Sequence, residues 1–220
     1  MKKLSQAIAL ASVMTAGLTG VSAAQAEVSV AVDLANKYIF RGLDMGGAAL
    51  VAGTVDYEHE SGAYAGFWAA SGDTAAGNEY NAYFGFGGEA GSFSYDINYL
   101  AYMYPADKTM SLDSWGEVTV GLGYDSFSFS ASVPVTEDQE GIYVYYTLGA
   151  EFGAFGALVG FSDGDEKGSD YSDNYTHLDL SYAYNDNISF VLSKIVDQGS
   201  DTDLNDSTLF QVNYSLPINF

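Results

Sequence analysis

The side chains able to act in catalysis are two histidines, His59 and His177, in a chain without cysteine. A histidine activates a serine when a carboxylate orients it, so a serine hydrolase is the enzyme class to consider. Serine and aspartate are frequent throughout the sequence, and chance neighbours of each histidine are expected. We therefore predict that the protein is not an enzyme and holds no cofactor, with a hydrolase as the least favoured alternative.

A second kind of chemistry is the selection of ions by charged side chains that line a narrow passage. Several segments alternate between apolar and polar residues, and their polar positions are often acidic. The residues that we expect to line such a passage are Asp33, Lys37, Arg41, Asp56, Glu58, Glu79, Asp96, Glu117, Glu151, His177 and Asp179. Carboxylates outnumber cations in this set, so the passage would concentrate cations and repel anions. Pairing with Lys37 or Arg41, or exposure to water at the rims, would weaken that preference.

Arg41 is the single arginine of the chain, and a glycine follows it. We place it at the end of the first predicted strand, from which it can reach Asp56 or Glu58 or line a constriction. An unpaired arginine in a narrow interior is unfavourable, so an internal salt bridge is the favoured role.

Two acidic segments, 163–170 and 197–206, have the composition of calcium-binding loops. Neither fits the EF-hand spacing, because Lys167 occupies a ligand position in the first and Asp206 replaces the required glycine in the second. We interpret both as solvated loops without a metal site, and weak binding of divalent cations stays open.

A β-sheet would position these side chains, and the dominant pattern after residue 26 is an alternation of apolar and polar residues, which is typical of strands. It is clearest in 93–99, 127–133 and 178–182. No segment there is apolar for long enough to span a bilayer as a helix. We predict twelve strands, or ten if two hairpins are misread, at 28–40, 49–59, 63–71, 79–87, 92–103, 114–124, 127–136, 141–151, 155–162, 174–184, 188–197 and 208–220.

The connections between these strands alternate in length. The short ones are 60–62, 88–91, 125–126, 152–154 and 185–187, and the long ones are 41–48, 72–78, 104–113, 137–140, 162–173 and 198–207. Short turns on one rim and long loops on the other are typical of an outer-membrane barrel with both termini in the periplasm. A soluble β-sandwich shows no such alternation, so the predicted fold is an all-β, closed antiparallel transmembrane barrel.

The first 26 residues have the pattern of a secretory signal peptide. Lys2 and Lys3 precede an apolar stretch, and Ala24-Gln25-Ala26 is an Ala-x-Ala cleavage site. We expect cleavage before Glu27, which leaves a single domain, 27–220, of 194 residues. The two leader lysines leave five basic residues against 29 acidic ones, a net charge of −24. Nucleic-acid binding needs basic clusters and is excluded.

The last predicted strand is apolar at every second position back from the end. These positions are Phe210, Val212, Tyr214, Leu216, Ile218 and Phe220. A terminal phenylalanine with this period resembles the signal by which the barrel assembly machinery recognises outer-membrane proteins. An ordinary amphipathic strand is the alternative.

Specific motifs support this assignment. The chain has Tyr38-Ile39-Phe40-Arg41-Gly42, followed by a segment at 56–68 that begins Asp56-Tyr57-Glu58-His59 and ends at Trp68. With these motifs the chain resembles the TorF family, formerly a family of unknown function, over nearly all of its length after the leader. The resemblance implies an outer-membrane barrel and leaves the activity open.

The function predicted from these patterns is a porin-like channel for passive diffusion of small solutes, with a preference for cations. Its expected partners are outer-membrane lipids, lipopolysaccharide, the assembly machinery during biogenesis, and small solutes or cations. The alternative is a plugged barrel with a structural or adhesive role, its interior filled by side chains such as Tyr83, Tyr143 and Tyr145.

Overall fold

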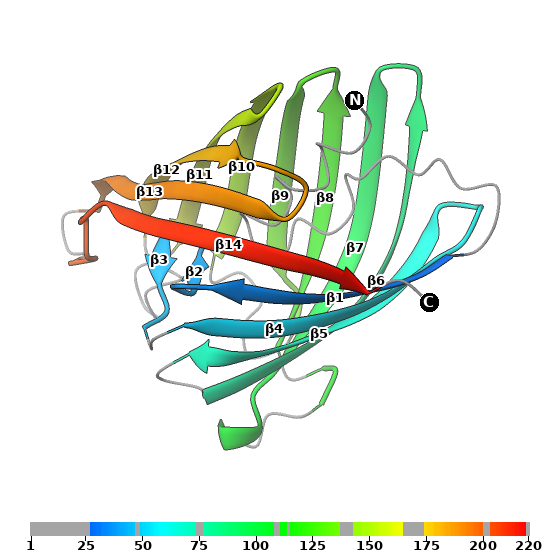
Figure 1. Cartoon of the computed structure of the whole chain (residues 1–220), viewed down its shortest axis with the longest axis horizontal. Helices are drawn as coiled ribbons and strands as arrows, with labels where there is room; N and C mark the ends of the chain where they lie inside the picture. The colour runs from blue at the N-terminus through cyan, green and yellow to red at the C-terminus, as the bar shows by residue number, and fades with distance from the viewer. Residues whose placement is uncertain are drawn as a thin grey trace.

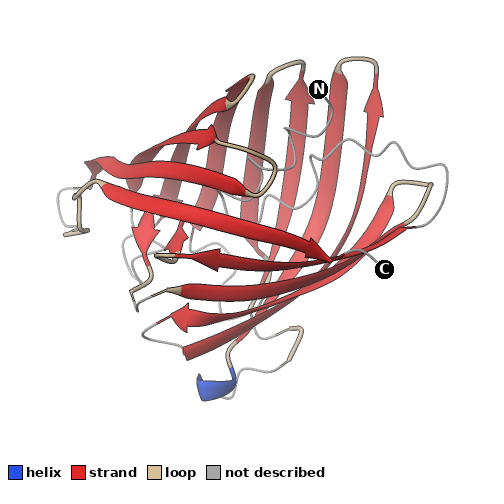
Figure 2. Ribbon diagram, in the orientation of Figure 1, coloured by secondary structure: helices blue, strands red, loops and turns tan. Residues whose placement is uncertain are grey.

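The computed structural model describes residues 27–46, 49–73, 77–107, 111–113, 115–136, 143–164, 174–199 and 203–218. Both the predicted leader and Phe220 lie outside these ranges. Within them, no helix has the length and apolar character needed to cross a bilayer. The chain is almost entirely strand, with one short 3-10 turn, η1 (Pro105–Asp107) (Figure 2).

Twelve antiparallel strands close into one barrel (Figure 1). They are β1 (Glu27–Ala35), β4 (Leu50–Glu58), β5 (Ala63–Asp73), β6 (Gly77–Ala90), β7 (Phe93–Met103), β8 (Gly116–Tyr124), β9 (Phe127–Pro134), β10 (Tyr143–Phe152), β11 (Phe155–Gly164), β12 (Tyr175–Ala183), β13 (Ile188–Gln198) and β14 (Leu209–Ile218). The ring closes where β1 pairs with β14, from Val30↔Ile218 to Ala35↔Asn213. The predicted all-β, closed antiparallel barrel of twelve wall strands is confirmed. A closed ring leaves no unpaired edge.

The connections alternate between the two rims of the barrel. One rim carries the tight turns 59–62, 91–92, 125–126, 153–154 and 184–187, together with the start of β1 and the end of β14. The opposite rim carries the longer connections, except the one between β5 and β6, which has only three residues. The predicted loop 72–78 is wrong, because β5 extends to Asp73 and β6 begins at Gly77.

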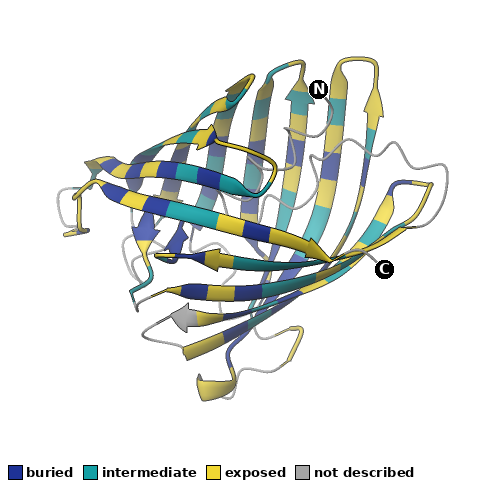
Figure 3. Ribbon diagram, in the orientation of Figure 1, coloured by how far each residue is buried: buried dark blue, intermediate teal, exposed yellow. Residues whose placement is uncertain are grey.

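Burial alternates along the strands, as Figure 3 shows. In β9, Phe127, Phe129 and Val133 are exposed on the outer face, whereas Ser130 and Ser132 are buried on the inner face. Large apolar side chains cover the outside of the barrel, and Phe84 and Leu148 are 60% and 63% exposed. Polar residues therefore line the interior, which reverses the arrangement of a soluble protein.

The first predicted strand, 28–40, is wrong at its end. The barrel strand β1 stops at Ala35, and the chain then folds inward as a small hairpin of β2 (Ile39–Phe40) and β3 (Leu43–Asp44). We call residues 38–45 the inner hairpin. In Figure 1 it lies within the outline of the barrel behind β1 and β14, near the rim with the long connections. Arg41 and Gly42 form its tip, both with positive φ, 52° and 83°.

Candidate functional site

The arginine at the tip of the inner hairpin reaches the barrel wall. Nη1 and Nη2 of Arg41 donate to Oε1 and Oε2 of Glu117, on β8, at 3.0 and 2.7 Å. The guanidinium carbon also lies 4.3 Å from the ring centre of Tyr145 and 4.8 Å from that of Phe40. A bidentate pair combined with ring stacking fixes the guanidinium in position and orientation. This anchor offsets the backbone strain of a non-glycine residue with positive φ.

The carboxylate of Glu117 is held by three side chains. It is only 1% exposed, and besides Arg41 it accepts hydrogen bonds from Tyr102, at 2.7 Å, and from Tyr143. Burying a carboxylate is unfavourable unless opposite charge and hydrogen bonds replace water. Here the hairpin supplies the cation, and β7 and β10 supply the hydroxyl groups. The hairpin tip therefore stabilises the buried carboxylate of the wall, and that carboxylate holds the tip in place.

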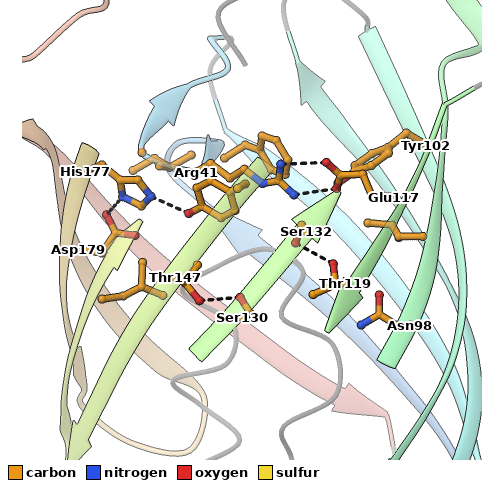
Figure 4. A pocket seen from close by; sticks show the side chains of 16 residues that line it. Arg41, Asn98, Tyr102, Glu117, Thr119, Ser130, Ser132, Thr147, His177 and Asp179 are labelled. Carbon is orange, nitrogen blue, oxygen red and sulfur yellow. Dashed lines mark hydrogen bonds and ion pairs between the residues drawn. The ribbon is translucent and has the colours of Figure 1, made fainter. Parts of the chain in front are cut away.

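His177, on β12, joins the same network from the other side. Its Nδ1 lies 3.0 Å from Oδ1 of Asp179, and its Nε2 lies 2.7 Å from the hydroxyl oxygen of Tyr145. The rings of Tyr145 and His177 are nearly parallel, with 5° between their planes. Figure 4 shows Arg41 between Glu117 on one wall and the His177–Asp179 pair on the other.

Two glycines make room for His177. A Cβ atom at Gly42, on the hairpin, would lie 2.6 Å from the Cβ of His177. A Cβ atom at Gly160, on β11, would collide with His177 and with the hydroxyl of Tyr145. The hairpin can therefore approach β12 this closely only because these two positions lack side chains.

Further contacts attach the hairpin around the barrel. Tyr38 donates a hydrogen bond of 2.8 Å to Glu79 on β6, and its ring packs on Trp68 of β5. On the opposite side, Leu43 packs in an apolar cluster with Tyr175, Ile195 and Leu204. The inner hairpin thus narrows the lumen at the rim with the long connections.

Beneath the hairpin, one wall of the lumen presents hydroxyl groups. Thr119 and Ser132 form a hydrogen bond of 2.7 Å between their side chains, and Ser130 and Thr147 form one of 2.6 Å. These residues come from β8, β9 and β10, and with the hairpin they enclose a cavity (Figure 4). These four side chains are polar and uncharged.

The wall formed by β1 and β4 to β7 is acidic instead. Asp96 accepts hydrogen bonds of 2.8 Å from Tyr64 and from Asn98, and Asp56 accepts one from Tyr83. Asp33 lies near both Asp56 and Ser215. Neutral hydroxyl and amide groups orient these carboxylates, and in the described part of the chain no salt bridge joins them to a cation. Their negative charge is therefore left uncompensated.

The structure distributes the predicted lining residues over distinct places. On the inner face lie Asp33, Asp56, Glu58, Glu79, Asp96, Glu117, His177 and Asp179. Glu151 lies on the same inner face of β10 as Tyr145 and Thr147, where it is exposed beside a tight turn. Lys37 follows β1 and pairs with Asp44 at 2.5 Å. The predicted salt bridge of Arg41 exists, but its partner is Glu117 and neither Asp56 nor Glu58, because the chain turns inward before Arg41.

One sequence element has the spacing of a serine-hydrolase nucleophile, Gly-x-Ser-x-Gly, at 160–164. That motif works on a sharp turn that exposes the serine. Here Ser162 is 1% exposed within the regular strand β11. Both ring nitrogens of the neighbouring His177 are bonded to Tyr145 and Asp179. His59 lies in an exposed turn, 2.9 Å from Ser61. Neither histidine forms a serine–histidine–carboxylate triad within the described ranges.

Several residues that hold the hairpin in place were not predicted as site residues, among them Tyr38, Phe40 and Tyr102. Tyr38 to Phe40 are three consecutive residues buried in the interior, where a wall strand would alternate. That loss of alternation just before Arg41-Gly42 is the signal that the strand ends earlier. Tyr102 lies at a regular inward position of β7, and nothing in its local sequence distinguishes it from other inward tyrosines.

The acidic loops and the terminal strand are only partly described. Residues 165–170 and 200–202 lie outside the described ranges, and no group of three metal-ligating side chains occurs within those ranges. In β14, Phe210, Tyr214, Leu216 and Ile218 are exposed on the outer face, and Val212 is half-buried.

Comparisons with known proteins place the sequence in a family. A family model described as "Bacterial protein of unknown function (Gcw_chp)" matches residues 20–213. Comparison with curated proteins finds no match.

Solved structures of similar shape include two of the KdgM porin, the second titled as a complex with disordered oligogalacturonate. Both are 9% identical in sequence to this chain. The first has a TM-score of 0.49 and the match covers 87% of this chain and 99% of the porin chain. The second has a TM-score of 0.46, with 88% of this chain and 98% of the porin chain covered. Outer membrane phospholipase A from Escherichia coli is 10% identical, with a TM-score of 0.43. The match covers 88% of this chain and 90% of the phospholipase chain. Likenesses this distant carry no argument about activity.

Proposed function

The chain belongs to the Gcw_chp family of bacterial proteins of unknown function, and we propose that it is a porin-like channel of the outer membrane that prefers cations. The observation that carries the proposal is a closed barrel with an apolar outside and a polar, acidic inside. In water this distribution of side chains is unfavourable, whereas in a bilayer the outer face meets hydrocarbon and the lumen holds water.

Aromatic residues on the outer face support the membrane setting. Near the tight turns, ring contacts link neighbouring strands around part of the barrel: Phe86 with Tyr95, Phe127 with Phe152, Phe155 with Tyr182, and Tyr182 with Phe190. A band of aromatic rings at one level is typical of a membrane–water interface. Outer-membrane barrels have their short turns on the periplasmic side, so we propose that this rim, with both ends of the described barrel, faces the periplasm.

The charges of the lumen support cation preference. The carboxylates of Asp33, Asp56, Glu58 and Asp96 face the interior, whereas the cations Arg41 and Lys37 are each paired with a carboxylate. Uncompensated negative charge in a narrow, partly desolvated passage raises the local concentration of cations.

The inner hairpin favours a second candidate, a plugged barrel without conductance. Its contacts reach β5, β6, β8 and β12, so it occupies much of the cross-section near one rim. The two candidates differ in one measurable quantity, the current through single molecules.

The test is single-channel recording of purified protein in planar bilayers. We expect discrete conductance steps, and under a salt gradient a reversal potential of the sign that cation selectivity gives. An anion-selective potential would contradict the preference, and membrane insertion without any current would favour the plugged barrel. Recovery in the aqueous fraction without detergent would contradict both.

The remaining expectations stay proposals. The outer face would contact outer-membrane lipids and lipopolysaccharide. The barrel assembly machinery would recognise strand β14, in which every second residue is apolar. Membership of the TorF family, the predicted leader and the absence of enzyme activity also stay predictions.

A further inference from the structure

We propose that the cavity beneath the inner hairpin is a binding site for small neutral polyhydroxylated solutes, such as a single sugar ring. The inference deepens the proposed channel function and rests on it, because it names a class of solute. The cavity and the solvent that it opens to together make up about 650 Å³ of space between the lining side chains. Its ceiling is the hairpin from Ile39 to Gly42, and its walls are β7 to β12 (Figure 4).

The permanent positive charge at this cavity is compensated locally. The guanidinium of Arg41 is paired with the carboxylate of Glu117, and Nδ1 of His177 lies 3.0 Å from Oδ1 of Asp179. A cation entering the cavity would meet the guanidinium of Arg41 at the ceiling, and an anion would meet the carboxylates of Glu117 and Asp179. A neutral solute avoids both repulsions, whereas the acidic wall of Asp56 and Asp96 favours cations elsewhere in the lumen.

The uncharged groups in the cavity match the chemistry of a polyol. In each hydroxyl pair, Thr119–Ser132 and Ser130–Thr147, one hydrogen is used between the partners. Each pair therefore keeps a second hydrogen to donate and oxygen lone pairs to accept. A polyol carries donors and acceptors on adjacent carbons, so it can use both capacities at once.

Apolar side chains complete the site. Leu100 and Leu158 line the same cavity, and Tyr145 presents its ring there between Arg41 and His177. A sugar ring has a face of C–H groups as well as its hydroxyls. The cavity thus offers apolar surface beside hydrogen-bonding groups, which is the usual composition of a small-molecule site.

The test compares three sugars of similar size that differ in charge: glucose, glucuronate and glucosamine. Binding to the full-length purified protein in detergent micelles is measured by nuclear magnetic resonance titration, at a pH where glucosamine is protonated. We expect glucose to bind several-fold more tightly than either charged sugar. Tighter binding of glucosamine would mean that the acidic wall holds the solute, and equal or absent binding of all three would also overturn the proposal.

A paired substitution locates the site. Ser130→Ala with Thr147→Val removes both members of one hydroxyl pair together, so no buried hydroxyl loses its partner. We expect glucose affinity to fall about tenfold, as the loss of one or two neutral hydrogen bonds predicts. The matched control is Ser128→Ala, an inward position of β9 outside the cavity lining, which should bind like the unaltered protein. Unchanged affinity in the double variant would contradict the site.

The two proposals can fail separately. Glucose binding without channel current would support the binding site and contradict the channel function. Channel current without a preference for glucose would support the channel function and contradict the binding site. Retention of the folded barrel in each variant is checked by its heat-dependent migration in gels.

Discussion

Arg41 carries a permanent positive charge in a barrel where most of the described charged side chains on the inner face are acidic. It does not pair with the more exposed carboxylates Asp56 and Glu58 but with Glu117, which lies deep in the wall between Tyr102 and Tyr143. A carboxylate so far from water gains most from a fixed bidentate cation, because water cannot replace that partner. The hydroxyl donors of the two tyrosines then satisfy the remaining lone pairs.

We predict that Glu117→Gln destabilises the protein by about 3–5 kcal/mol, the usual effect of leaving a buried charge without its partner. Glutamine keeps the size of the side chain, so the change reports on charge rather than on packing. The measurement is urea unfolding of the protein in lipid vesicles, followed by tryptophan fluorescence.

The matched control for that prediction is Glu151→Gln. Glu151 is an exposed residue beside a tight turn, and surface substitutions usually change stability by less than about 0.5 kcal/mol. Equal stability of the two variants would show that the ion pair of Arg41 contributes nothing.

The inner hairpin is the element that distinguishes this barrel from a plain ring of strands. It leaves the wall after β1 and is held by hydrogen bonds, an ion pair and apolar contacts to strands on several sides of the lumen. These contacts come from residues distant in the sequence, so the hairpin forms its final structure only when the barrel has closed. Its position inside the barrel, at the rim with the long connections, makes it the constriction that we propose for the passage.

We predict that replacing residues 38–45 with a short glycine–serine linker raises single-channel conductance several-fold while the barrel remains closed. The hairpin contributes no strand to the ring, so its loss leaves every pair of wall strands intact. Inserting the same linker into the exposed turn at 184–187 is the control and should leave conductance unchanged. If removal of the hairpin has no effect on current, the limiting constriction lies elsewhere.

The whole molecule separates its surfaces by polarity: apolar outside, acidic on one inner wall and hydroxyl-lined on the facing strands. This separation follows from the closed ring, in which every second residue of each strand points inward. Ion selectivity then belongs to the barrel as a whole, because the field in the lumen is the sum of carboxylates on several strands.

We predict that Asp56→Asn combined with Asp96→Asn lowers the ratio of cation to anion permeability by several-fold, measured from the reversal potential in a salt gradient. Asparagine keeps the shape and an acceptor for the hydrogen bonds of Tyr83 and Tyr64. Raising the salt concentration should reduce the selectivity of the unaltered protein, since counterions screen exposed charges. A ratio unaffected by both changes would contradict selection by the acidic wall.

Local periodicity was sufficient to predict most of the wall. Alternation in segments such as 127–133 identifies strands and their inward residues, because a pleated strand turns successive side chains to opposite faces whatever its neighbours are. Most of the tight turns were predictable for a similar reason, since a connection of two to four residues leaves the chain few conformations. The predicted turn 88–91 is too early, because β6 extends to Ala90. The predicted loop 72–78 failed because strand ends depend on pairing with the next strand.

The sequence by itself determined the ring of strands, its two rims and which residues face inward. Only the tertiary structure decided that the chain after Ala35 turns into the lumen, that Arg41 pairs with Glu117 across 76 positions, and that Gly42 and Gly160 make room for His177. The physical reason is the distance along the sequence over which each feature is determined. Alternation of apolar and polar residues is a property of neighbouring residues, whereas the partner of a buried charge depends on which distant strands the closed barrel brings together.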